Sequence, residues 1–183
     1  LLTLRGTPFL YYGEEIGMRN VEVPREQMRD PLALTLHPSL SRDPERTPMH
    51  WSAEPGAGFT RGTPWLPIGA DVAKRNAATL REDRDSLLWL YRDLLELRRA
   101  TPALERGSFR ALPAPDGVLA YERSCGGSRA IIALNFSAEP RSAGLASARV
   151  SGGLRTRRGE SLPSDAAKLE LAPSQGAVLI VES

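Results

Sequence analysis

Hydrophobic positions between residues 85 and 100 recur at the spacing of an amphipathic helix. The apolar side chains of this stretch are Leu87, Leu88, Leu90, Tyr91, Leu94, Leu95 and Leu97. Asp83 or Asp85 can cap the start of the helix, and Thr101-Pro102 ends it. We therefore predict a helix over residues 85–100 whose leucine stripe packs into a core.

After about residue 105 the pattern changes from helical to alternating. Short apolar runs occur at residues 108–112, 118–123, 129–136, 147–150, 168–172 and 177–182, and they are separated by glycine, proline or serine. This spacing predicts a small antiparallel β-sandwich. All three tryptophans precede it, which supports a boundary near residues 101–107.

Residues 19–83 show no regular period and are rich in proline. So long an irregular stretch is unusual in a compact domain unless it is functional or disordered. Aromatic and apolar residues within it, Trp51, Phe59 and Trp65 among them, argue against disorder. We expect a packed, functional excursion of the chain.

A short apolar and aromatic run, Phe9–Tyr12, follows a Gly-Thr-Pro break and ends at Gly13 and two carboxylates, Glu14 and Glu15. A buried parallel strand that delivers polar groups at its C-terminal end has this pattern. Leu1–Arg5, which begins without a methionine, reads as the last turn of a helix. We expect the chain to be the C-terminal part of a longer protein.

The composition is that of a globular protein, with 41% hydrophobic and 25% charged residues. No run of 18 apolar residues occurs, so we expect no membrane partner. The formal net charge is +2, and the 22 arginines are scattered, so we expect no nucleic-acid partner either. The densest basic spot, Arg155, Arg157 and Arg158, reads as an exposed turn.

Cys125 is the only cysteine, so the sequence offers no intrachain disulfide or structural zinc site. A nucleophilic role for Cys125 would need a partnered base, and His37 and His50 both lie far away in the sequence. We predict no cofactor and no metal.

Residues 42–51, Arg-Asp-Pro-Glu-Arg-Thr-Pro-Met-His-Trp, form the most informative stretch of the chain. Pro44 and Pro48 restrict the backbone and remove donors, so the segment is a stiff loop that holds Arg42 and Arg46 at set angles. Binding residues tend to lie on such loops. The alternative is a surface turn with a chance salt bridge.

Two blocks together resemble the α-amylase superfamily, glycoside hydrolase family thirteen, in its α-glucosidase and oligo-1,6-glucosidase branch. The blocks are residues 6–18, Gly-Thr-Pro-x-x-Tyr-x-Gly-Glu-Glu-Ile-Gly-Met, and residues 42–51, Arg-Asp-x-x-Arg-Thr-Pro-Met-x-Trp. The resemblance implies the fold class of an α/β barrel fragment, with the last strand, long loop and last helix of a TIM-type barrel, followed by a small antiparallel β-sandwich. It implies two domains: the C-terminal portion of the (β/α)8 barrel over residues 1–102 and the sandwich over residues 103–183. Phe9–Tyr12 would be the eighth barrel strand.

The resemblance also implies where the chemistry lies. Retaining glycosidases use two carboxyl groups about 5–5.5 Å apart. Glu14 and Glu15 cannot together be this catalytic pair, because neighbours on an extended chain point to opposite sides. The family's catalytic acids come from earlier strands, so all are expected upstream of Leu1.

Substrate binding is what the resemblance leaves to this chain. Arg42 matches the arginine that holds hydroxyls of the non-reducing glucose, Asp43 is expected to orient Arg42 or Arg46, and Glu14 is the candidate on the leaving-group side. Arg46, Met49 and Trp51 are expected to pack the loop onto the barrel, and Tyr11 and Tyr12 to lie in the barrel core.

The resulting hypothesis is the C-terminal part of a cytoplasmic, retaining α-glucosidase that acts on oligosaccharide or disaccharide substrates. The parent is the enzyme, and the chain alone is predicted to be inactive. Two alternatives stay open: a trehalose synthase-type isomerase of the same family, and a non-catalytic scaffold module with this architecture. The sequence leaves the oligomeric state undetermined.

Overall fold

The computed structural model describes residues 1–182 of the chain. Residue contacts divide the chain into two compact units. The β unit comprises Leu1–Phe9 and the chain from Arg92 onward, and the loop unit comprises Leu10–Tyr91. The predicted domain boundary lies between residues 102 and 103, whereas the units change between residues 91 and 92. The predicted domains, residues 1–102 and 103–183, stay a prediction.

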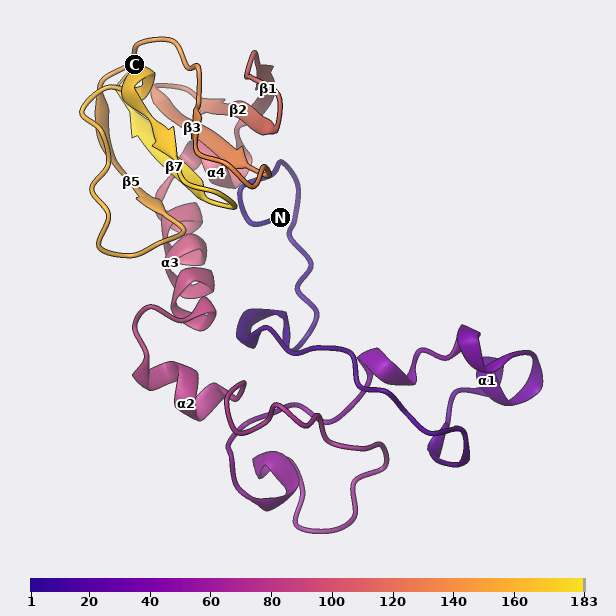
Figure 1. The fold of residues 1–183 in the computed structure, drawn as a ribbon. Coiled ribbons are helices and arrows are strands. Elements are labelled where there is room, and N and C mark those ends of the chain that lie inside the picture. Colours follow the sequence, from indigo (N-terminus) through magenta and orange to yellow (C-terminus); the bar gives the residue numbers. More distant parts are fainter. Residues whose placement is uncertain (183) are drawn as a thin grey trace. The chain divides into compact units, whose positions relative to one another are not determined.

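An antiparallel sheet forms the centre of the β unit (Figure 1). Its five strands lie in the order β1 (Ser108–Leu112), β2 (Val118–Cys125), β3 (Ser128–Asn135), β7 (Gly176–Val181) and β5 (Val150–Arg155). Two further strands, β4 (Arg141–Ser142) and β6 (Glu170–Leu171), form a separate antiparallel pair. The predicted antiparallel β architecture after residue 105 is confirmed.

Apolar side chains cover both faces of this sheet, because successive residues of a strand point to opposite faces. On one face, Ile131 and Leu179 of the sheet pack with Leu169 and Leu171, so the small pair of strands closes this side. On the other face, Ile132 and Val178 pack with residues from α3 (Leu87–Ala100) and α4 (Pro102–Arg106). The predicted helix over residues 85–100 is therefore confirmed to within two residues, and Leu94 and Leu97 of its stripe pack on the sheet.

One strand lies where the sequence pattern did not place it. Residues 147–150 were expected to form a strand, whereas β5 begins at Val150 and continues through Gly152 and Gly153. The glycine pair resembles a turn in the sequence, but Gly153 lies against β7, where a Cβ atom would come within 2.0 Å of the Val178 carbonyl oxygen. A strand can approach its neighbour this closely only with glycine.

The basic spot that begins at the last residue of β5 is also not a simple exposed turn. The Arg155 guanidinium donates hydrogen bonds to the carbonyl oxygens of Ser161, at 3.0 Å, and Glu170, at 2.8 Å. Arg158 forms an ion pair with Asp93 of α3. Arginine carries several donors in a fixed plane, so one guanidinium can join the carbonyls of two separate segments.

Two buried arginines hold the first residues of the chain in the β unit. Arg98 of α3 donates to the carbonyls of Leu2, Leu4 and Gly6, at 2.8, 3.0 and 2.6 Å. Arg123 of β2 donates to the Thr3 carbonyl at 2.7 Å. Residues 1–5 form turns, so the expectation of a helical turn here is wrong.

The loop unit is largely irregular, as predicted, but it contains short helices that the sequence pattern did not reveal. These are α1 (Pro31–Thr35) and α2 (Ala77–Glu82), together with the 3-10 turns η1 (Glu14–Ile16), η2 (Arg25–Gln27), η3 (Pro38–Leu40), η4 (Asp43–Glu45) and η5 (Pro55–Gly58). Its core cluster contains Ile16, Met49 and Ala77. The prolines begin several of these helices, where a missing N–H costs nothing.

The run Phe9–Tyr12 is neither a strand nor buried. Phe9 is 85% exposed, and Leu10, Tyr11 and Tyr12 are exposed as well. A strand needs a neighbour to satisfy its backbone groups, and the residues described here offer this run no strand partner. The expectations of a barrel strand here, and of core positions for Tyr11 and Tyr12, are therefore not met in residues 1–182.

Candidate functional site

The site that the sequence analysis singled out begins at the start of α1, where Asp30 caps the helix. The Asp30 Oδ1 atom accepts the Leu32 N–H at 3.1 Å, and Pro31 occupies the first helical position. Thr35 closes the turn by donating its hydroxyl to the Pro31 carbonyl at 2.7 Å. Asp-Pro is a favourable helix start because the carboxylate satisfies a free N–H and proline presets the backbone.

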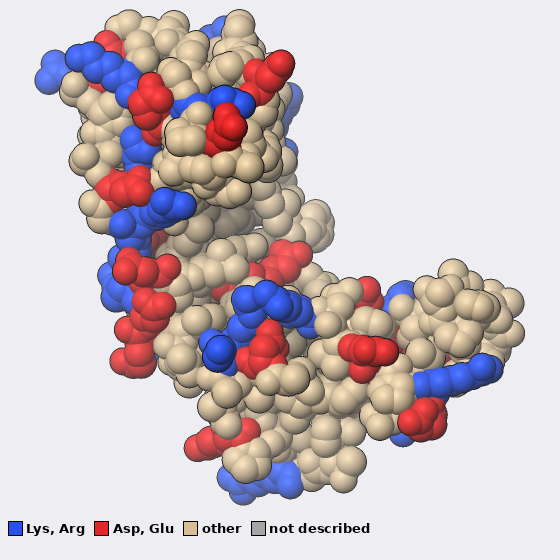
Figure 2. Space-filling model, in the orientation of Figure 1, with Lys and Arg blue, Asp and Glu red and all other residues tan. Residues whose placement is uncertain are grey.

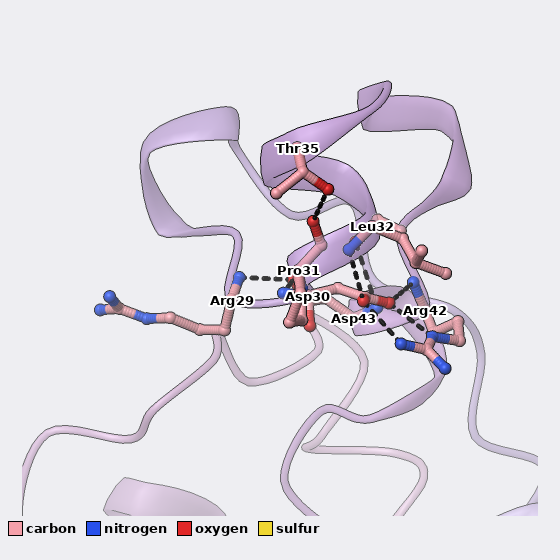
Figure 3. Close-up of polar contacts among 8 residues, drawn as sticks. Arg29, Asp30, Pro31, Leu32, Thr35, Arg42 and Asp43 are labelled. Carbon is pink, nitrogen blue, oxygen red and sulfur yellow. Dashed lines mark hydrogen bonds and ion pairs between the residues drawn. The ribbon is translucent and has the colours of Figure 1, made fainter.

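Asp30 also binds Arg42, in a two-pronged ion pair (Figure 3). Arg42 Nε lies 2.7 Å from Asp30 Oδ2, and its Nη2 lies 2.7 Å from Oδ1. The side chain of Asp30 is 0% exposed, whereas that of Arg42 is 50% exposed. One edge of the guanidinium is therefore fixed by a buried carboxylate, while half of the Arg42 side chain stays exposed.

Asp43 hydrogen-bonds to the backbone that carries Asp30. Its buried Oδ2 atom accepts the backbone N–H groups of Arg29, at 2.6 Å, and Asp30, at 2.9 Å. The sequence analysis expected Asp43 to orient Arg42 or Arg46, and in the structure its hydrogen bonds go to the backbone that carries Asp30, so a role in orienting Arg42 stays a prediction. Asp43 fixes the segment that carries Asp30, and Asp30 holds Arg42 (Figure 3).

Charge pairing keeps both groups of the ion pair ionised. The hydrogen bond from Arg42 holds the pKa of the Asp30 carboxyl well below its ordinary value. The same bond raises the pKa of the Arg42 guanidinium. Arg42 therefore presents a permanent positive charge and fixed donors at any working pH.

Glu14 and Glu15 lie in η1, which follows the exposed run at residues 9–12. Glu15 Oε2 accepts the Gly13 N–H at 2.8 Å, and Glu15 also lines a cavity. Glu14 is exposed and does not line that cavity. Glu15 therefore both holds the loop and lines the cavity, whereas Glu14 is the residue expected on the leaving-group side.

The cavity beside Glu15 is rich in aromatic side chains. It has a volume of about 340 Å³ and is lined by Tyr12, Glu15, Arg46, Thr47, Pro48, Met49, Trp51, Phe59 and Trp65. Met49 is buried, as a packing role requires, whereas Trp51, Phe59 and Trp65 keep about half of their surface exposed. Packing of Arg46 and Trp51 against a barrel stays a prediction.

The histidine of the same segment, His50, is buried in the loop unit. Its Nδ1 lies 2.9 Å from the Arg75 carbonyl oxygen, which fixes the ring against the segment before α2. Within residues 1–182, no group of three or more His, Cys, Asp or Glu side chains is arranged to hold a metal ion. None of the helices described there is long and apolar enough to cross a membrane.

Asp30 is the site residue that the sequence analysis missed. A signal for it exists, because the tripeptide Arg-Asp-Pro occurs twice, at residues 29–31 and at residues 42–44. The two copies lie together, and each aspartate accepts backbone N–H groups of the other copy. The recurrence of Arg-Asp-Pro in one loop is therefore the sequence signal for the contact between the two tripeptides.

Comparison with known proteins gives this arrangement its context. Residues 1–107 match the family described as Alpha-amylase, "Alpha amylase, catalytic domain". That match covers more than half of the chain and includes both sequence blocks.

The chain belongs to the α-amylase family.

Individual members agree with this assignment. A probable α-glucosidase of Rhizobium meliloti (strain 1021) is 36% identical over 140 residues, which cover 76% of this chain and 25% of that protein. An oligo-1,6-glucosidase of Parageobacillus thermoglucosidasius is 32% identical over 154 residues, covering 73% of this chain and 27% of that protein. The chain thus spans about a quarter of the length of these curated relatives.

A solved structure is similar over nearly the whole chain. The isomaltulose synthase of Klebsiella sp. LX3 is 30% identical, with a TM-score of 0.86 and coverage of 99% of this chain and 36% of that one. The resemblance read from the two sequence blocks is therefore confirmed at the level of the family and its α-glucosidase branch.

Proposed function

We propose that this chain is the C-terminal part of a retaining α-glucosidase that hydrolyses α-linked gluco-oligosaccharides from the non-reducing end. In this proposal, residues 1–102 are the end of a (β/α)8 barrel and residues 103–183 are a C-terminal β-sandwich domain. The chain contributes substrate-binding residues, and the catalytic acids come from the preceding part of a parent protein located in the cytoplasm.

The geometry of Arg42 is the observation that carries this proposal. A guanidinium that is fixed on one edge by buried Asp30, on a side chain that is 50% exposed, can donate to neighbouring hydroxyls of a sugar ring. Because its direction is fixed before a ligand arrives, binding does not have to order the side chain. Charge-assisted bonds of this kind contribute about 1.5–3 kcal/mol each.

Glu14 is the proposed contact on the leaving-group side. It is exposed at the first position of η1, and its neighbour Glu15 is committed to Gly13. A free carboxylate can accept hydrogen bonds from sugar hydroxyls, whereas a carboxylate bonded to the backbone keeps the loop in shape. Asp43 supports the site through the backbone of Asp30.

An assay of the full-length protein on maltose, isomaltose, sucrose and trehalose tests the proposal. Release of glucose from maltose or isomaltose with retained anomeric configuration is the expected result. The 183-residue chain alone is expected to show no turnover, because it supplies no catalytic pair. Absence of any turnover by the full-length protein would contradict the hydrolase and favour a scaffold module.

An isomerase of the trehalose synthase type is the second candidate. The similarity to a solved isomaltulose synthase supports this candidate, because the match covers 99% of this chain. Such an enzyme would rearrange a disaccharide while excluding water. Interconversion of disaccharides without release of glucose, in the same assay, would assign the protein to this second function.

A further inference from the structure

A groove on the β unit contains chemistry that the proposed function leaves unused. It has a volume of about 390 Å³, and its lining comes from β1, β2, β3 and the segment at residues 144–148. This volume lies within the range of small-molecule sites, about 300–1,000 Å³. Ile131 and Leu145, both buried, belong to its apolar floor.

Three charged side chains meet over this floor. Arg110 Nη2 lies 3.2 Å from Glu122 Oε2, and Arg129 Nη2 lies 2.8 Å from the same oxygen. The strand register produces this cluster, because Arg110 is the direct partner of Glu122 across β1 and β2. The Glu122 side chain is only 10% exposed, whereas that of Arg110 is 63% exposed.

The groove therefore offers both donors and an acceptor in fixed positions. Burial raises the pKa of Glu122, but the hydrogen bonds and charges of Arg129 and Arg110 outweigh burial and hold the pKa below its ordinary value. The carboxylate is ionised at neutral pH. Both ion pairs use Oε2, so Oε1 can accept a further hydrogen bond, and the exposed guanidinium of Arg110 can donate one.

The charges of the groove favour a neutral polar ligand over an anion. Two arginines and one glutamate line the groove, and Ser147 of the same lining donates its hydroxyl to Asp165 at 2.6 Å. The second carboxylate reduces the positive potential that the arginines would present to an anion. A sugar ring fits this setting, because its hydroxyls both donate and accept while its C–H face can lie on Ile131 and Leu145.

We propose that this groove binds a glucosyl unit of a neutral α-glucan oligosaccharide. Arg110 and Glu122 would bond its hydroxyls, and the residues around Leu145 would contact its apolar face. The choice of an α-glucan rests on the proposed function, whereas the groove and its charges do not. Such a site would hold substrate chains on the β unit.

Titration of the 183-residue chain with maltotriose, followed by the amide NMR signals of residues 110–112, 129–131 and 144–148, tests this site. Saturable shifts confined to these signals are expected, with a dissociation constant on the order of 1 mM for a small, partly open site. Arg110→Ala should weaken binding at least about tenfold through loss of a charge-assisted hydrogen bond. Ala146→Tyr, at an exposed position of the lining, should block the groove and abolish the shifts.

Arg149→Ala is the matched control. Arg149 pairs with Glu182 on the surface of the same unit and does not line the groove, so the variant should bind like the unchanged chain. Saturable shifts that survive both Arg110→Ala and Ala146→Tyr would overturn the proposal, as would their complete absence. Inorganic phosphate that produces the same shifts while maltotriose does not would make the groove an anion site instead.

The groove and the proposed function fail in different ways. If the full-length protein hydrolyses maltose but these signals do not respond to maltotriose, the groove proposal is wrong and the hydrolase stands. If the signals respond but no disaccharide is turned over, the groove is a carbohydrate site on a protein that is not an α-glucosidase.

Discussion

Asp30 and Asp43 each accept backbone N–H groups from the segment that carries the other. Asp30 Oδ2 accepts the Arg42 N–H at 2.8 Å, and Asp43 Oδ2 accepts those of Arg29 and Asp30. Two carboxylates thus join two Arg-Asp-Pro tripeptides without a strand or long helix between them. The guanidinium of Arg42 is positioned as a result, because its anchor, Asp30, is itself fixed.

Replacement of Arg42 tests its contact with substrate. In the full-length enzyme, Arg42→Ala should lower kcat/KM by roughly ten- to a hundredfold, because the substrate loses charge-assisted hydrogen bonds. Arg42→Lys should recover only part of this loss, since a lysine lacks the planar fork. Steady-state kinetics on maltose and isomaltose measure both effects. Arg25→Ala, at an exposed position of η2, should leave the kinetics unchanged.

Asp30→Asn tests whether the carboxylate positions Arg42. Asparagine can still cap α1, so the helix start should survive while the ion pair is lost. We expect kcat/KM to fall about tenfold with most of the effect on KM, since a mobile Arg42 must be ordered when substrate binds. Adding Asp30→Asn to Arg42→Ala should then have little further effect. Fully additive losses in this double-mutant cycle would show that the two residues act separately.

The same ion pair predicts a dependence of stability on pH. Arg42 holds the pKa of Asp30 below its ordinary value of about 4, so the unfolded chain takes up this proton at a higher pH than the folded chain. The pair therefore stabilises the folded state fully above about pH 4, and this contribution is lost as pH falls below that value toward the folded pKa. Urea unfolding at pH 7 and pH 3, followed by tryptophan fluorescence, measures it, because all three tryptophans lie in the loop unit. If the Asp30→Asn variant lost as much stability between pH 7 and pH 3 as the unchanged chain, the assignment of this pH dependence to the ion pair would be contradicted.

Two adjacent glycines of β5 offer a matched pair of variants. Gly153→Ala should destabilise the β unit by roughly 2 kcal/mol or more, because the backbone is left-handed, with φ of 130°, and the new Cβ would meet β7. Gly152→Ala meets nothing within 4 Å and should cost little. Thermal unfolding followed by circular dichroism compares the two. Similar melting temperatures for both variants would show that β5 and β7 separate easily.

The parts of the fold that the sequence revealed are those held by short-range patterns. The helix at residues 87–100 and strands β1, β2, β3 and β7 follow from apolar periodicity alone. Residues 9–12 have the composition of a buried strand, but composition does not supply a pairing partner. β5 was misplaced because its glycines serve a close approach to β7, which only tertiary structure shows.

In the candidate site, too, the residues found from the sequence are those with a local sequence signal. Arg42 and Asp43 stand out because a rigid, proline-bounded loop carries them. Asp30 did not stand out, because a lone Asp-Pro reads as a helix start and its second role, binding Arg42, depends on a contact across 12 residues of loop. Whether Arg42, Glu14 and Asp43 bind substrate stays a prediction.

The bonds from Arg98 and Arg123 to the first residues of the chain have a consequence for synthesis. Residues 2–6 leave the ribosome before the arginines that bind their carbonyls, because Arg98 follows Leu2 by 96 residues and Arg123 follows Thr3 by 120 residues. Contacts so distant in sequence form late, because the intervening chain must be ordered first. Residues 2–6 should therefore dock onto the β unit after translation has passed β2, so that a chain truncated before this strand would leave these residues undocked and open to proteases.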